Sequence, residues 1–286
     1  MPDAVPDLNV KATLLLALHA EGRPALVLPN AWDPASAALI AEAGARAIAT
    51  TIGGVAWARG RPDGEGLSRA EMAEAVTRIV AAVDVPVTAD VEAGYGATPR
   101  DVAATIRAML DAGAVGVNLE DSRAPGGPLF TAGDQAERIG AARAAAVDAG
   151  VPDVVINART DVFLFRVGAP ETRVDAVLAR AEAFAAAGAD CLFVPGLLDL
   201  AVLRALVAAA ALPVNAMAVP GGPGIGEIAA TGVRRISVGT AISEAAYAVA
   251  RRAARELLSL GGYGSLADAV PYGELNALLD RRPTAP

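Results

Sequence analysis

The sequence contains very few of the side chains that most often act as nucleophiles and bases in enzymes. Its 286 residues include a single cysteine, Cys191, a single histidine, His19, and a single lysine, Lys11. Because Lys11 and His19 both fall in the first predicted helix, a Schiff-base lysine deep in the fold, a histidine-rich zinc site and a Ser-His or Cys-His pair are excluded. One cysteine also excludes an internal disulfide. The chemistry must therefore come from carboxylates, arginines, hydroxyls, amides or a metal ion.

Targeting signals and nucleic-acid-binding charge are also missing. The N-terminal residues lack the basic start and apolar run of a signal peptide. The longest apolar stretch, residues 198–220, is interrupted by Asp199, Arg204 and Pro213, so it predicts a helix followed by a strand instead of a membrane span. The net charge of −8 argues against nucleic acid or an anionic membrane surface as a partner. We therefore expect a cytoplasmic enzyme that acts on small molecules.

Apolar residues, by contrast, are abundant and recur in a regular pattern. Hydrophobic side chains make up 54% of the chain, which is enough for a large core. Strand-like runs begin near residues 25, 87, 154 and 214 after a proline, and near residues 47, 115, 190 and 234 after a glycine that ends an alanine-rich helix. The two kinds of strand start alternate and give eight strand–helix units. This predicts a (β/α)8 TIM barrel of parallel strands, with an open doubly wound sheet as the alternative.

The length of the chain fits one such barrel, for which about 250 residues are typical. We expect a single domain over residues 1–286, with a C-terminal helical extension from about residue 260. His19, near the end of the first helix, is predicted to be a surface or helix-end residue. Cys191, at the start of the sixth strand, is predicted to be a small core residue.

Acidic side chains end two neighbouring predicted strands. In a barrel of this kind the active site lies at the carboxyl ends of the strands. Asp90 and Glu92 end the third strand and, if the strand continues through both, point to the same side, while Glu120 ends the fourth. Three carboxylates converging there repel one another, and a hard divalent cation relieves that repulsion. We therefore predict Asp90, Glu92 and Glu120 as ligands of Mg²⁺ or Mn²⁺.

An arginine ends the next strand. The guanidinium of Arg159 can clamp a substrate carboxylate with two parallel hydrogen bonds. Ion pairs among these charged side chains, or caps on the following helices, are the structural alternative. Gly94 and Gly96 suit a tight turn that folds the loop back over the site, and they suit an ordinary turn equally well.

At these residues the chain resembles the isocitrate lyase/phosphoenolpyruvate mutase superfamily, along nearly its whole length. The acidic motifs occur in order and at consistent spacing. The matching segments are N-A-W-D-P-A-S-A (30–37), T-T-I-G-G (50–54), R-P-D (61–63), T-A-D-V-E-A-G-Y-G (88–96), G-V-N-L-E-D-S (116–122), N-A-R-T-D (157–161), A-G-A-D-C-L-F-V-P-G (187–196) and P-V-N (213–215).

The resemblance implies a barrel whose eighth helix is exchanged between subunits, in a homotetramer built as a dimer of dimers. It also implies bound Mg²⁺ and a 2-oxo carboxylate or its enolate. Asp90 then corresponds to the principal metal ligand. Asp63, Glu92 and Glu120 correspond to carboxylates that hold the metal largely through its waters.

The resemblance assigns substrate contacts as well. Arg159 corresponds to the ligand of the substrate carboxylate. Thr51, with the backbone amides of Ile52 and Gly53, occupies the position that binds the other end of the oxo acid.

Two segments depart from the superfamily pattern. Its lyases carry a lysine-x-cysteine-glycine-histidine motif on the loop after the fourth strand, where the cysteine is the general acid, but that loop here is S-R-A-P-G-G-P-L-F (122–130). Its mutases use a lysine and an asparagine on the same loop and a histidine at the end of the sixth strand, where this chain has Pro195. Cleavage of isocitrate or methylisocitrate by that mechanism, and phosphoryl migration, are therefore not favoured.

The remaining shared core indicates a metal-dependent carbon–carbon lyase that stabilises an enolate. Decarboxylation of oxaloacetate needs the least additional machinery, and a retro-aldol or hydrolytic cut that leaves a pyruvate-type enolate is related to it. A phosphorylated or phosphono oxo acid, with phosphate at the glycine-rich run 221–224, is a second hypothesis, and a catalytically silent metal- and carboxylate-binding oligomer is a third. The predicted catalytic residues are Asp63, Glu92, Tyr95, Arg159 and Asn215, of which Tyr95 and Asn215 would orient the substrate or donate a proton.

Overall fold

The computed structural model describes residues 4–20, 22–64, 66–124 and 126–280. Its strands form one parallel sheet in the order β1-β9-β8-β7-β6-β5-β4-β3-β2. The strands are β1 (Leu26–Leu28), β2 (Asn30–Ala31), β3 (Ile48–Thr50), β4 (Val87–Asp90), β5 (Gly116–Glu120), β6 (Val155–Arg159), β7 (Cys191–Phe193), β8 (Val214–Met217) and β9 (Arg235–Ser237).

The two ends of this sheet belong to one segment of the chain. Strands β1 and β2 are separated by one residue, Pro29. Val27 of β1 pairs with Ile236 of β9, while Ala31 of β2 pairs with Thr50 of β3. Because the first and last strands of the order are halves of the same segment, the sheet closes into a barrel. The predicted (β/α)8 barrel is confirmed, with strands at all eight predicted positions.

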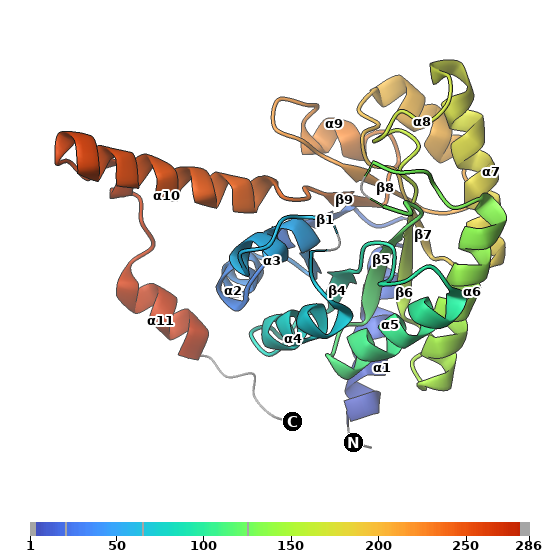
Figure 1. The fold of residues 1–286 in the computed structure, drawn as a ribbon, viewed down its shortest axis with the longest axis horizontal. Coiled ribbons are helices and arrows are strands. Elements are labelled where there is room, and N and C mark those ends of the chain that lie inside the picture. The colour runs from blue at the N-terminus through green and yellow to red at the C-terminus, as the bar shows by residue number, and fades with distance from the viewer. Residues whose placement is uncertain (1–3, 21, 65, 125, 281–286) are drawn as a thin grey trace.

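Helices connect successive strands and surround the barrel (Figure 1). They are α1 (Ala4–Leu18), α2 (Pro34–Glu42), α3 (Ile52–Ala58), α4 (Arg69–Val80), α5 (Pro99–Asp111), α6 (Ala132–Asp148), α7 (Arg173–Ala186), α8 (Leu200–Ala209), α9 (Ile225–Ala229), α10 (Ala241–Leu260) and α11 (Tyr272–Asp280), with short 3₁₀ turns η1 (Pro170–Thr172) and η2 (Gly264–Leu266).

Glycines end four of these helices, as the sequence pattern predicts. Gly44, Gly113, Gly188 and Gly232 have φ angles of 98°, 91°, 98° and 95°. L-residues with a side chain rarely adopt that left-handed conformation, so glycine is the usual residue just after a helix. At Gly113 space is limiting too, because a Cβ there would lie 2.7 Å from Val80 Cγ1.

Helix α1 packs against the end of the barrel where the strands begin. Leu15 is fully buried, and a Cβ on Gly116, the first residue of β5, would lie 2.8 Å from Leu15 Cδ2. His19 directly follows α1, as predicted, but it is only 2% exposed, so its prediction as a surface residue is wrong. It is buried because the end of α1 lies against the barrel floor, near Arg235. Cys191 is a buried core residue, as predicted.

The C-terminal segment leaves the barrel. Helix α10 extends away from the other helices, and α11 follows it back toward α2 (Figure 1). Gly261, with φ of 65°, ends α10. Large apolar side chains along this segment are exposed, including Leu257, Leu258, Leu260 and Tyr272. No helix in the described part of the chain is long and apolar enough to cross a membrane.

Candidate functional site

A cavity of about 230 Å³ opens among the carboxyl ends of the strands. Its small volume suits a ligand smaller than most drug-like molecules, whose pockets start at about 300 Å³. The cavity is lined by Asn30, Ala49, Thr50, Thr51, Ile52, Gly53, Asp63, Thr88, Asp90, Asn118, Asn157, Arg159, Leu164, Phe193, Asn215, Met217, Arg235, Ser237, Gly239 and Thr240.

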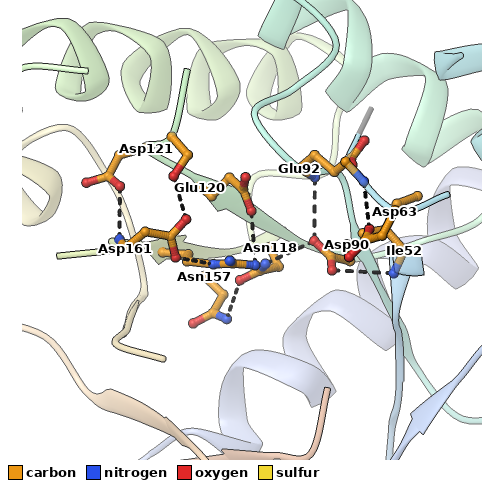
Figure 2. Close-up of polar contacts among 12 residues, drawn as sticks. Ile52, Asp63, Asp90, Glu92, Asn118, Glu120, Asp121, Asn157 and Asp161 are labelled. Atoms are coloured by element: carbon orange, nitrogen blue, oxygen red, sulfur yellow. Dashed lines mark hydrogen bonds and ion pairs between the residues drawn. The ribbon is translucent and has the colours of Figure 1, made fainter. Parts of the chain in front are cut away.

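Asp90, the last residue of β4, is held from two sides (Figure 2). Its Oδ1 accepts a hydrogen bond of 3.1 Å from Asn118 Nδ2, and its Oδ2 accepts one of 3.4 Å from the backbone nitrogen of Ile52. Asn157 Nδ2 in turn donates a hydrogen bond to Asn118 Oδ1. Burial raises the pKa of Asp90, the positive charge of Arg159 opposes that rise, and the Asp63 carboxylate adds to it.

Arg159 is already engaged by two carboxylates. Its Nη1 lies 3.0 Å from Glu120 Oε2, and its Nε lies 2.6 Å from Asp161 Oδ1. Burial raises the pKa of Glu120, and the charge of Arg159 only partly offsets this because Asp161, Asp90 and other carboxylates crowd the same region. Those carboxylates keep Arg159 charged. The ion-pair alternative is thus realised at Arg159, with part of the guanidinium still facing the cavity.

Glu92 does not lie as the sequence predicts. Strand β4 ends at Asp90, and Glu92 has φ of 49°, so the period-two rule no longer applies to the pair. Tyr95 also has a left-handed φ, of 57°. Non-glycine residues in this conformation persist only where the surroundings hold them, and they cluster at functional sites.

Two arginines from neighbouring helices hold the loop after β4. Arg138 of α6 is 1% exposed and donates to the carbonyls of Ala93 and Gly96. Arg69 of α4 donates to the Tyr95 carbonyl at 3.2 Å. The sequence analysis missed both arginines, because helix positions 26 or more residues from the loop carry no local signal of that contact.

The start of α3 forms another part of the cavity wall. Thr51 is the N-cap of α3, and Ile52 and Gly53 follow it, so backbone N–H groups point toward the cavity end of this helix. Asp63 lies against the same point, because a Cβ on Gly53 would lie 3.1 Å from Asp63 Oδ2. A Cβ there would also lie 2.8 Å from Thr240 Cγ2, so glycine is required for this close packing.

The cavity wall formed by β8 and β9 carries side-chain donors that have no acceptor. Asn215 of β8 and Arg235 of β9 pair in register and both line the cavity. Neither Asn215 Nδ2 nor the Nε and Nη1 atoms of Arg235 has a hydrogen-bond acceptor. Arg235 was missed because it begins its strand, whereas polar residues were sought at strand ends. Arg235 lies two residues before Ser237, so both side chains point to the same, inward face of β9. This spacing was the sequence signal that could have identified Arg235 as a cavity residue.

The structure therefore brings part of the predicted site together. Asp90 and Arg159 line one cavity, and five further predicted residues join them, namely Thr51, Ile52, Gly53, Asp63 and Asn215. Glu92, Tyr95 and Glu120 are not among the residues that line it. Their predicted roles, as metal ligands or catalytic groups, stay predictions.

The donor set fits a divalent cation that keeps much of its water. Among the described residues, no three histidine, cysteine, aspartate or glutamate side chains converge on one ion position. Mg²⁺ commonly takes only one or two protein carboxylates directly and retains several waters. Asp90, on the cavity wall and repelled by Asp63, fits the direct ligand, whereas the roles of Glu92 and Glu120 in holding the metal through its waters stay predictions.

The loop that departs from the superfamily pattern is a short hairpin fixed to the barrel. Ser122 and Leu129 form an antiparallel bridge, and Phe130 N donates to Asp121 O. Ser122 Oγ also donates to Asp161 Oδ2 at 2.6 Å. The glycine-rich run 221–224, considered for phosphate, contributes nothing to the cavity wall.

Comparison with known proteins agrees with this geometry. The phosphoenolpyruvate phosphomutase sequence profile matches residues 15–258. The chain is 32% identical to the 2-methylisocitrate lyase of Escherichia coli K12 over 70% of its length and 71% of the enzyme's, and 34% identical to the oxaloacetate decarboxylase of Rhodopseudomonas palustris BisB18 over 57% and 54%. A candidate phosphonomutase from Burkholderia cenocepacia J2315 superposes with a TM-score of 0.80 at 49% identity, covering 89% of this chain and all of the other. The chain belongs to the phosphoenolpyruvate phosphomutase family, within the isocitrate lyase/phosphoenolpyruvate mutase superfamily.

Proposed function

We propose that the protein is a divalent-metal-dependent carbon–carbon lyase acting on a small 2-oxo dicarboxylate, and that the reaction is decarboxylation of oxaloacetate. One observation carries this proposal. A single small cavity combines Arg159, the Asp90 carboxylate and the amide end of α3, while the hairpin 122–130 contains no lysine, cysteine or histidine. The similarity to an oxaloacetate decarboxylase supports the same reaction.

The chain's own residues bind and orient the acid. Arg159 forms charge-assisted hydrogen bonds to the carboxylate next to the 2-oxo group. The backbone N–H groups of Ile52 and Gly53, which the resemblance assigns to the other end of the oxo acid, are here assigned to the oxygens beside Arg159 because they lie next to Asp90. The Asn215 amide orients the rest of the molecule. A divalent cation held by Asp90 would act as a Lewis acid toward the 2-oxo oxygen.

Decarboxylation then needs no strong acid from the protein. The bond between C3 and the departing carboxylate breaks, its electron pair forms the C2–C3 double bond of the enolate, and CO₂ leaves. The guanidinium of Arg159 and the amide N–H groups at Ile52 and Gly53 stabilise the negative charge that develops. C3 afterwards takes a proton from water, which fits a cavity wall that lacks Tyr95 and any histidine or cysteine.

A coupled assay tests this function. Purified protein is incubated with oxaloacetate and Mg²⁺, and pyruvate and CO₂ are followed, with Asp90→Asn protein at the same metal concentration as the matched control. We expect equal amounts of the two products, loss of turnover with a chelator, and recovery when Mg²⁺ is restored. Turnover that survives the chelator contradicts the metal dependence. Binding of oxo acids without turnover favours the catalytically silent oligomer, and conversion of phosphonopyruvate favours a mutase.

We also propose that the protein is a homo-oligomer, a dimer of dimers in which α10 packs on a neighbouring subunit. The projection of α10 and its exposed leucines support this, since monomers rarely expose large contiguous apolar patches (Figure 1). Light scattering should give a tetramer mass, and Leu258→Glu should lower it, whereas Arg204→Glu on the exposed face of α8 should not. A monomeric wild-type protein would contradict the proposal.

A further inference from the structure

Two guanidinium groups line the cavity, and they differ in how they are paired. Arg159 contacts Glu120 and Asp161. Arg235 is 2% exposed, and its Nε and Nη1 atoms have no hydrogen-bond acceptor. Burying a charged group without a hydrogen-bonding partner is costly, so such groups are rare unless a ligand or metal completes them. The unpaired N–H groups of Arg235 therefore point to a missing anion.

A neighbouring amide adds a third donor. Asn215 is directly opposite Arg235 in the parallel β8–β9 pair and is fully buried. Its Oδ1 lies 3.4 Å from Ser237 Oγ, whereas its Nδ2 has no acceptor. Both side chains line the cavity, and three of their donor nitrogens lack acceptors. Three donors with no acceptor match the oxygens of a carboxylate better than they match a neutral group.

Within the part of the chain that the structure describes, no charged group supplies an acceptor to Arg235. Asp90 is within electrostatic reach of Arg235, but its oxygens accept hydrogen bonds from Ile52 and Asn118. Below the arginine, burial lowers the pKa of His19 to about 4, so that ring is neutral at pH 7. Burial raises the pKa of the Cys191 thiol to about 12, so it is also neutral.

We propose that Arg235, assisted by Asn215, binds the second carboxylate of the substrate, while Arg159 binds the carboxylate beside the 2-oxo group. This inference rests on the proposed function and names the side chains that would recognise the second carboxylate of its substrate. The β6 and β9 strands that carry the two arginines are separated in the barrel by β7 and β8, so the two anionic groups occupy different walls of one cavity. A monocarboxylate such as pyruvate can pair with Arg159 but leaves Arg235 without an anionic partner.

Calorimetric binding with two probes tests the assignment without relying on turnover. Pyruvate supplies one carboxylate, and 3,3-difluorooxaloacetate supplies two without an enolisable C3. In the presence of Mg²⁺ we expect wild type to bind the dianion roughly 10- to 100-fold more tightly than pyruvate, as hydrogen bonds to charged groups allow. Arg235→Gln should remove this preference and leave the pyruvate affinity within about threefold, whereas Arg235→Lys should restore part of it.

The outcomes separate the two proposals. If wild type binds neither acid, the proposed function fails. If it binds both equally well and Arg235→Gln changes neither affinity, the function stands and the Arg235 assignment is wrong. Phosphonopyruvate bound more tightly than the dicarboxylate through Arg235 would overturn the choice of carboxylate. Arg204→Gln, on the exposed face of α8, controls for the change in net charge. If Arg235→Gln does not fold, Arg235→Lys is tested alone. Loss of the pyruvate and dianion affinities by the same factor in Arg235→Lys would also overturn the assignment.

Discussion

The two sides of the cavity differ in how the protein pairs its own charged groups. On the side of β4, β5 and β6, Asp90 is hydrogen-bonded and Arg159 is paired with Glu120 and Asp161. On the side of β8 and β9, Asn215 and Arg235 keep donors without acceptors. The first side resembles an internal ion-pair network, which holds its shape without ligand. The second side carries a free-energy cost that an anion would relieve. Substitution of the paired Arg159 should therefore lower the free energy of unfolding, whereas substitution of the unpaired Arg235 should raise it.

The largest expected effect is on the paired side. Arg159→Met leaves Glu120 and Asp161 buried without their cation, and removing one partner of a buried ion pair typically costs about 3–5 kcal/mol. Urea unfolding at neutral pH should show a loss of this size in the free energy of unfolding, while Arg204→Met on the exposed face of α8 should change it little. A wild-type value for Arg159→Met would mean that the two ion pairs contribute nothing to stability.

Asp90 lies on the same side as Arg159, but we expect its substitution to affect turnover instead of stability. Asp90→Ala removes the predicted metal ligand and should lower kcat for oxaloacetate by about 10²- to 10³-fold, similar to the loss of one electrostatic group in other active sites. Because burial raises the pKa of Asp90, the fold disfavours its charged form, and we expect that the melting temperature does not fall. Wild-type turnover by this variant would show that the site has been assigned to the wrong carboxylate.

The unpaired side should give the opposite sign of stability change. Arg235→Met replaces a buried, unpartnered cation with an apolar side chain of similar length, and such replacements are often neutral or stabilising, by about 1–4 kcal/mol. We expect the free energy of unfolding to rise in the ligand-free protein while affinity for dicarboxylates falls. A destabilisation as large as that of Arg159→Met would remove the contrast between the two arginines.

The smallest expected effect is on the pH dependence of stability. Burial lowers the pKa of His19 from 6.5 to about 4, and the charge of Arg235 adds to this. The unfolded chain therefore binds the proton before the folded chain does, so stability is fully present above pH 6.5 and is lost as the pH falls toward 4. At pH 5 the loss attributable to His19 should be about 2 kcal/mol. His19→Asn, compared with wild type by urea unfolding at pH 5 and 7.5, should show a smaller decrease, and an unchanged decrease would rule out His19 as the source.

The barrel was predictable because the signals that specify it are local. A glycine after each alanine-rich helix and a proline before alternate strands mark the start of every strand, and Gly44, Gly113, Gly188 and Gly232 take the left-handed conformation that the pattern requires. The buried position of His19 was not predictable, because it depends on where α1 lies against the barrel floor.

The site was predictable only in part. Asp90 and Arg159 end their strands and were found by searching strand ends. The direction of the Glu92 side chain could not be inferred from strand periodicity, because β4 stops two residues earlier and the backbone turns left-handed. Arg138 was missed because its contacts join segments far apart in the sequence, which helical periodicity does not reveal. Arg235 was missed because the search covered strand ends, whereas Arg235 begins β9.

The fixed hairpin at 122–130 has a consequence for the stereochemistry of the product. Its ends are joined by the Ser122–Leu129 bridge, Arg123 forms an ion pair with Asp134, and none of its described residues lines the cavity. Without such a cover, solvent reaches both faces of an enolate. Decarboxylation of 3-methyloxaloacetate in deuterated water should then place deuterium at both prochiral positions of C3 of 2-oxobutanoate in equal amounts, as NMR of a chiral derivative can measure. A single labelled position would show that one face is shielded.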